Sequence, residues 1–178
     1  MSKYEQIMLK FKECRVMKNK EKKYKEMNQA YKALLGEEKD WLANLANSSA
    51  ILYQFLDDIN WAGFYLWRND QLILGPFQGK TACVRIEEGR GVCGKAYAQR
   101  KIMLVKNVNE FPDHIACDPN SKSEIVIPVI AAGEVIAVLD IDSPILARFD
   151  EIDRRYLQEF VDILVDKTDF LPFMEKLI

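Results

Sequence analysis

The sequence predicts an α+β fold in which a central antiparallel sheet is flanked by helices on both faces. Changes in the spacing of apolar residues support this fold class. Helical spacing runs through the first third of the chain, gives way to alternation after Asn60, and returns after Pro144. Short turns join the alternating segments, which is typical of antiparallel hairpins.

Helices are expected both before and after the sheet. Residues 3–35 carry apolar side chains three or four positions apart between many charges, and Gly36 ends this helix. Residues 38–57 place apolar and small side chains on one stripe, which predicts a second helix. A final amphipathic helix is expected after Ser143 and Pro144.

Two hairpins and two short strands make up the predicted sheet. The first hairpin pairs residues 61–67 with residues 71–77, and the second pairs residues 124–130 with residues 134–142 around Gly133. Between the hairpins we expect a strand near residues 83–86, a helix over 92–99, a strand over 102–105 and a polar loop over 106–123. So long a loop inside a compact domain is usually functional.

Composition restricts the class of partner. The chain has 178 residues, 49% of them apolar, which suffices for one core, and 25 basic residues nearly balance 27 acidic ones. Nucleic acid and anionic membrane are therefore not expected partners. The charged N-terminus does not resemble a signal peptide, and no apolar run approaches the roughly 18 residues of a membrane span. These features predict a cytoplasmic protein.

Three of the four cysteines are candidates for redox chemistry. Cys83, Cys93 and Cys117 are separated by nine and twenty-three intervening residues, so none forms the short pair typical of zinc sites. His114 would complete a formal set of zinc ligands, but in a reducing compartment thiol chemistry is the better interpretation, and we expect no metal. Cys14 lies among charges on a predicted helix and is interpreted as a bystander.

The residues alone do not rank Cys93 and Cys117 as nucleophile. Cys93 lies in Gly-Val-Cys-Gly at a predicted helix start, where unpaired N–H groups would stabilise a thiolate. Cys117 lies in a polar loop, where access is expected but the neighbouring acids would oppose ionisation.

Three carboxyl groups are expected to meet on one face of the second hairpin. Asp140 and Asp142 are two residues apart on a strand, so they share a face. A regular two-residue loop before Glu134 would pair Glu124 with Ile141, on the opposite face. We therefore predict a longer loop or a bulge near Pro128, which would bring Glu124 onto the face of the two aspartates. Clustered carboxylates raise one another's proton affinity, so one of them can stay protonated near neutral pH.

Two aromatic residues share a face of the first hairpin. Trp61 and Tyr65 are four residues apart on a strand and could line a small apolar pocket. Core packing is the more frequent role of such a pair.

Several motifs occur together in the order of a known family. They are the segments 60–65, 74–79, 82–86, 89–94, 114–118, 123–126 and 139–143. Through these segments the stretch from Asn60 to Ser143 resembles the free methionine-R-sulfoxide reductase family of GAF domains. We expect a GAF-like catalytic domain over residues 36–178, preceded by an N-terminal helical extension over residues 1–35.

The resemblance also implies an activity and roles for the three cysteines. The chain would reduce the R epimer of free L-methionine sulfoxide, with Cys117 as the attacking thiolate, Cys83 as the principal resolving cysteine and Cys93 as an auxiliary one. The attacking thiolate would become a sulfenic acid that condenses to a disulfide, and thioredoxin would reduce that disulfide. No metal, flavin or nicotinamide cofactor is implied.

The remaining implied site residues bind substrate or donate a proton. An acid must protonate the departing sulfoxide oxygen, and Glu124, Asp140 and Asp142 are candidates that could also bind the substrate ammonium. Trp61 and Tyr65 would hold the methyl group. Backbone N–H groups before Cys117, at Ala116, would bind the substrate carboxylate.

Other interpretations of the sequence remain open. A GAF domain that senses a small molecule or redox state is the main alternative, and a zinc-stabilised structural protein is a third. The family resemblance and the apolar N-terminal helices are compatible with a homodimer.

Overall fold

The computed structural model describes the backbone of residues 3–113 and 118–175 and the side chains of residues 17–113 and 118–175. The elements are α1 (Lys3–Leu35), α2 (Trp41–Phe55), β1 (Trp61–Arg68), β2 (Gln71–Gly79), β3 (Arg85–Glu87), α3 (Gly91–Gln99), β4 (Met103–Val105), the 3₁₀ turn η1 (Val108–Glu110), β5 (Ser123–Ala131), β6 (Glu134–Ser143), α4 (Glu151–Lys167) and α5 (Leu171–Met174).

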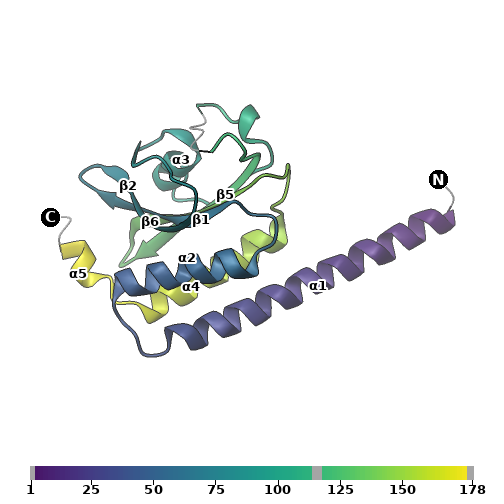
Figure 1. The fold of residues 1–178 in the computed structure, drawn as a ribbon, viewed down its shortest axis with the longest axis horizontal. Helices are drawn as coiled ribbons and strands as arrows, with labels where there is room; N and C mark the ends of the chain where they lie inside the picture. Colours follow the sequence, from purple (N-terminus) through teal and green to yellow (C-terminus); the bar gives the residue numbers. More distant parts are fainter. Residues whose placement is uncertain (1–2, 114–117, 176–178) are drawn as a thin grey trace.

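The described strands form one antiparallel sheet in the order β3-β2-β1-β6-β5-β4. Helices α1, α2 and α4 lie on one face and α3 lies on the other (Figure 1). Each face has its own buried core, a large one beneath α1, α2 and α4 and a smaller one beneath α3. This arrangement confirms the predicted fold class.

Most predicted elements are present, with shifted ends. The second helix is shorter than expected because the side chain of Asp40 accepts the N–H of Ala43 and caps it, and Leu56 already has extended backbone angles. The strand expected near residues 83–86 begins at Arg85, where pairing with β2 starts, so Cys83 lies in the segment before it. Part of the predicted long loop forms the single turn η1.

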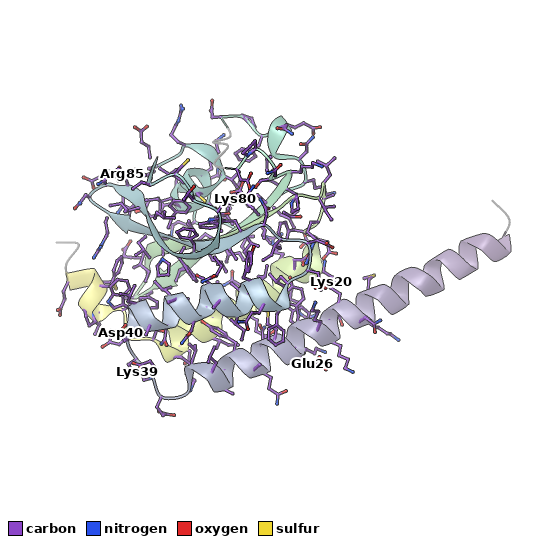
Figure 2. All side chains as sticks on the ribbon, viewed as in Figure 1. Lys20, Glu26, Lys39, Asp40, Lys80 and Arg85 are labelled. Carbon is purple, nitrogen blue, oxygen red and sulfur yellow. The ribbon has the colours of Figure 1, made fainter. Side chains whose placement is uncertain are left out.

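The second half of α1 belongs to the core of the helical face. Tyr24, Met27 and Tyr31 are buried there, and the ring of Tyr31 stacks on Phe160 of α4. Lys20, which Figure 2 places on α1, forms an ion pair with the buried Asp153 in the first turn of α4. A domain boundary between residues 35 and 36 stays a prediction.

The β5–β6 hairpin contains the predicted irregularity. Its loop is the two residues 132–133, yet Glu124 pairs with Asp142. The register shifts between Val129, which pairs with Ala137, and Ile130, which pairs with Val135. This bulge moves Glu124 onto the face that carries Asp140 and Asp142, as the sequence predicted.

No helix within the described ranges is both long and apolar enough to cross a bilayer.

Candidate active site

A pocket opens on the α3 face of the sheet, between β1, β5, β6 and the start of α3. It encloses about 530 Å³ of space between protein atoms, a figure that includes open solvent at its mouth. Its lining residues are Trp61, Tyr65, Thr81, Ala82, Ile86, Arg90, Gly91, Val92, Cys93, Asp118, Ser121, Glu124, Asp140 and Asp142. The pocket thus gathers both predicted aromatics, all three predicted acids and one predicted cysteine.

The aromatic wall is a stack of three rings. The Trp61 ring lies 5.9 Å from the Tyr65 ring and 5.3 Å from the Phe77 ring, measured between centroids. Gly63 makes this stack possible, because a Cβ atom at that position would lie 2.8 Å from the Trp61 ring and 2.3 Å from Phe77 Cβ. The indole therefore covers a position that has no side chain.

The acids and the thiol come from three adjacent elements. Ligand atoms of Cys93, Glu124 and Asp140 all lie within 4.8 Å of one another. The thiol of Cys93 donates a long hydrogen bond to Glu124 Oε1 at 3.9 Å. Glu124 is 5% exposed and Asp140 is 6% exposed, so both carboxyl groups have lost most of their hydration. Asp140 Oδ1 has no hydrogen-bond partner among the described residues.

Burial and crowding favour the protonated forms of the acids. Burial raises the pKa of Asp140 to about 7, and hydrogen bonds with Cys93 and Glu124 lower it only in part. Burial raises the pKa of Glu124 well above its ordinary value, and the charges of Asp140 and Asp142 raise it further. Burial, followed by the charge of Asp140, raises the pKa of Asp142 as well. The cluster therefore holds protons near neutral pH, as predicted for neighbouring carboxyl groups.

The expectation of a stabilised thiolate at Cys93 is wrong. The residue does lie in the first turn of α3, but it is only 4% exposed. Burial raises the pKa of the Cys93 thiol, and the nearby charges of Asp140 and Glu124 raise it further. Desolvation and like charge outweigh the favourable helix terminus, so Cys93 is a neutral thiol near pH 7.

Of the other two predicted cysteines, Cys83 lies within the described residues and Cys117 does not. Cys83 is half-buried, and its backbone carbonyl accepts a hydrogen bond of 3.0 Å from the Tyr65 hydroxyl. A residue of the aromatic wall thereby contacts the segment that carries Cys83. His114, Ala116 and Cys117 lie outside the described residues.

Comparison with known proteins identifies the family. The family model of the GAF domain matches residues 48–165, which is well over half of the chain. The free methionine-R-sulfoxide reductase of Escherichia coli is 48% identical over 158 residues, covering 87% of this chain and 96% of that protein. The enzyme of the same name from Saccharomyces cerevisiae is 40% identical over 154 residues, covering 82% of this chain and 86% of that protein.

The chain belongs to the GAF-domain family of free methionine-R-sulfoxide reductases. A solved structure agrees with this assignment. The free methionine-R-sulfoxide reductase of Neisseria meningitidis, determined in complex with its substrate, superposes with a TM-score of 0.78 at 46% identity. The match covers 81% of this chain and 87% of that one.

A polar network that the sequence did not predict lies beside the pocket of this member of the free methionine-R-sulfoxide reductase family. Asn60 Nδ2 donates hydrogen bonds to Asp118 Oδ2 at 3.2 Å and to Ser121 Oγ at 3.0 Å. Lys80, on the pocket side of the sheet in Figure 2, forms an ion pair of 3.2 Å with Asp118. The backbone N–H of Asn120 lowers the pKa of Asp118, and Asn60 and Lys80 lower it further. Asn60 and Asp118 stood in the recognised motifs, but no spacing rule showed that they would meet.

The buried Asp140 should make stability depend on pH. Its pKa is about 7 in the folded chain against an ordinary 3.8, so its stabilising contribution is complete below about pH 4 and is lost as pH rises through 7. Asp140→Asn cannot ionise. Relative to the wild type, this variant should gain on the order of 4 kcal/mol in free energy of unfolding between about pH 4 and about pH 8, measured by urea denaturation.

Asp162→Asn is the matched control, because Asp162 is exposed on α4. Its stability difference from the wild type should stay constant over the same pH range. Identical pH slopes for Asp140→Asn and the wild type would contradict the raised pKa.

Proposed function

We propose that the chain reduces free L-methionine-R-sulfoxide to L-methionine by thiol chemistry. One observation carries the proposal. A single pocket joins a stacked aromatic wall to a buried group of carboxyl groups that retain protons near neutral pH. The relatives named as free methionine-R-sulfoxide reductases support the same activity.

The pocket offers a complementary surface to each end of a free amino acid. The rings of Trp61 and Tyr65 provide an apolar surface for the methyl group and the sulfur. While one acid of the cluster keeps its proton, another that is charged attracts the ammonium group, and the unpartnered Asp140 Oδ1 is an acceptor for it. We assign the substrate carboxylate to backbone N–H groups near Ala116, which follows from the family resemblance.

The first chemical step transfers the sulfoxide oxygen to a cysteine. The Cys117 thiolate attacks the sulfoxide sulfur, the oxygen is protonated, and methionine leaves while Cys117 becomes a sulfenic acid. Glu124 is the proton donor in this proposal, because burial and two neighbouring acids hold its proton near pH 7. Asp140 and Asp142 bind the ammonium.

The second step restores the thiol. Cys83 attacks the sulfenic sulfur of Cys117, forming a disulfide and releasing water, and a dithiol such as thioredoxin reduces the disulfide and is itself oxidised. The hydrogen bond from Tyr65 to the Cys83 carbonyl keeps the Cys83 segment beside the pocket. Cys93 is an auxiliary thiol, since its pKa is raised.

The organisation of the chain completes the proposal. Residues 36–178 form the GAF-like catalytic domain, residues 1–35 form an N-terminal helical extension, and two copies of the chain form a homodimer. The protein acts in the cytoplasm, where thioredoxin is kept reduced.

The activity is tested with racemic free methionine sulfoxide, thioredoxin and thioredoxin reductase. We expect the R epimer to disappear while the S epimer persists. One methionine should form for each pair of reducing equivalents consumed. Chiral chromatography measures both epimers. Substrate that binds without being consumed would contradict the proposal and indicate a sensor.

Substitution of Cys117 and substitution of Cys83 should impair different steps of the reaction. Cys117→Ser removes the attacking thiolate and should abolish turnover with thioredoxin and with excess dithiothreitol. Cys83→Ser should still form one methionine per chain in a single turnover but lose thioredoxin-dependent recycling. Rapid-quench and steady-state assays separate the two steps. Equal loss of the single turnover in both variants would refute these roles.

Glu124→Gln should affect rate more than binding. An amide cannot donate the proton that the departing oxygen needs, so the single-turnover rate should fall by about 100-fold or more, with substrate affinity changed only a few-fold. Glu134→Gln, at the exposed end of the same hairpin, is the control and should leave both unchanged. Rapid-quench kinetics and calorimetry provide the two quantities. A Gln variant with the wild-type rate would place the proton donor elsewhere.

A further inference from the structure

The acid cluster has the composition of a metal-binding site. The Cys93 sulfur and one carboxylate oxygen each from Glu124 and Asp140 lie within 4.8 Å of one another. The three side chains come from α3, β5 and β6, so the surrounding sheet and helix hold them in place. All three are buried, and their distances do not depend on an exposed loop.

One hydrogen-bond acceptor in this cluster has no donor among the described residues. Asp140 lines the pocket, and its Oδ1 atom is buried with no hydrogen-bond partner among the described residues. Buried carboxylate oxygens are nearly always paired, so an unpaired one on a residue that lines a pocket indicates a ligand that supplies positive charge. The substrate ammonium is one such ligand, and a metal cation is another.

The donor set selects among cations. Zinc binds thiolate sulfur at about 2.3 Å and carboxylate oxygen at about 2.0 to 2.2 Å in tetrahedral geometry, so its ligands lie roughly 3.5 Å apart. The 3.9 Å between Cys93 Sγ and Glu124 Oε1 is close to that separation. A sulfur ligand favours Zn²⁺ and Cd²⁺ over Mg²⁺ and Ca²⁺, which prefer oxygen alone.

We propose that Cys93, Glu124 and Asp140 bind Zn²⁺ reversibly, and that the bound ion excludes substrate from the pocket. The ion displaces the protons of the thiol and the carboxyl groups into solvent, and water from the pocket completes its coordination. It is an inhibitor that occupies the position of the substrate ammonium. The inhibitory part of this inference rests on the proposed function, whereas the metal site itself does not.

Cadmium is the probe, because thiolate-to-cadmium charge transfer absorbs in the ultraviolet. The chain carrying Cys14→Ser, Cys83→Ser and Cys117→Ser keeps Cys93 as its one thiol, since the sequence has four cysteines. Titration of this chain should show the absorption band saturating at one equivalent of Cd²⁺. Adding Cys93→Ser should remove the band.

Acid variants of the same chain test the rest of the ligand set. Asp140→Asn and Glu124→Gln should each weaken Cd²⁺ binding by about tenfold or more, and Asp162→Asn on α4 should leave it unchanged. Circular dichroism establishes whether each variant is folded. If one acid variant does not fold, the other still tests the acid ligands. The absence of a saturable band, or an affinity indifferent to both acid substitutions, would overturn the site.

Competition tests the inhibitory part. Free methionine sulfoxide should weaken the apparent affinity for Cd²⁺, and Zn²⁺ should slow a single turnover of the wild type until a chelator removes it. A Cd²⁺ affinity unaffected by saturating sulfoxide would overturn exclusion. If the wild type turns over sulfoxide while the Cys93 chain binds no Cd²⁺, the metal site fails alone. If Cd²⁺ binds but sulfoxide is never consumed, the proposed function fails alone.

Discussion

Neighbouring residues of a strand point to opposite faces of the sheet, so the bulge between β5 and β6 decides which face carries the carboxyl group of Glu124. Without the bulge, the tight loop at residues 132–133 would pair Glu124 with Ile141, which is buried in the core beneath α1, α2 and α4. An acid there would lie among apolar side chains with no second acid beside it. The extra residue in β6 places Glu124 opposite Asp142 instead.

The same register aligns the rest of the pocket in rows across the sheet. Asp142 pairs with Glu124 on one side and with Trp61 on the other, so the acids and the first ring of the aromatic wall form one row. In the next row, Asp140 lies opposite Gly63. The chemistry of the pocket thus follows from strand pairing, and α3 adds Cys93 from above.

The sequence predicted what depends on local periodicity. Alternation fixed the faces of Trp61 and Tyr65, and counting residues through the second hairpin was enough to require a bulge for Glu124. Properties that depend on burial in the tertiary structure could not be predicted from local periodicity. The thiol of Cys93 looked activated from its helix position, yet its depth and the acids beside it set its pKa. The contact between Asn60 and Asp118 joins residues 58 positions apart, and no local pattern encodes such a contact.

The glycine beneath the indole has a consequence for the rigidity of the pocket wall. With no Cβ at position 63, the Trp61 ring lies flat over the backbone between Phe77 and Tyr65 and is itself 4% exposed. A ring packed this closely cannot swing aside, because rings already occupy the space on both sides. The absence of a side-chain atom at position 63 thus determines where the indole wall of the pocket stands.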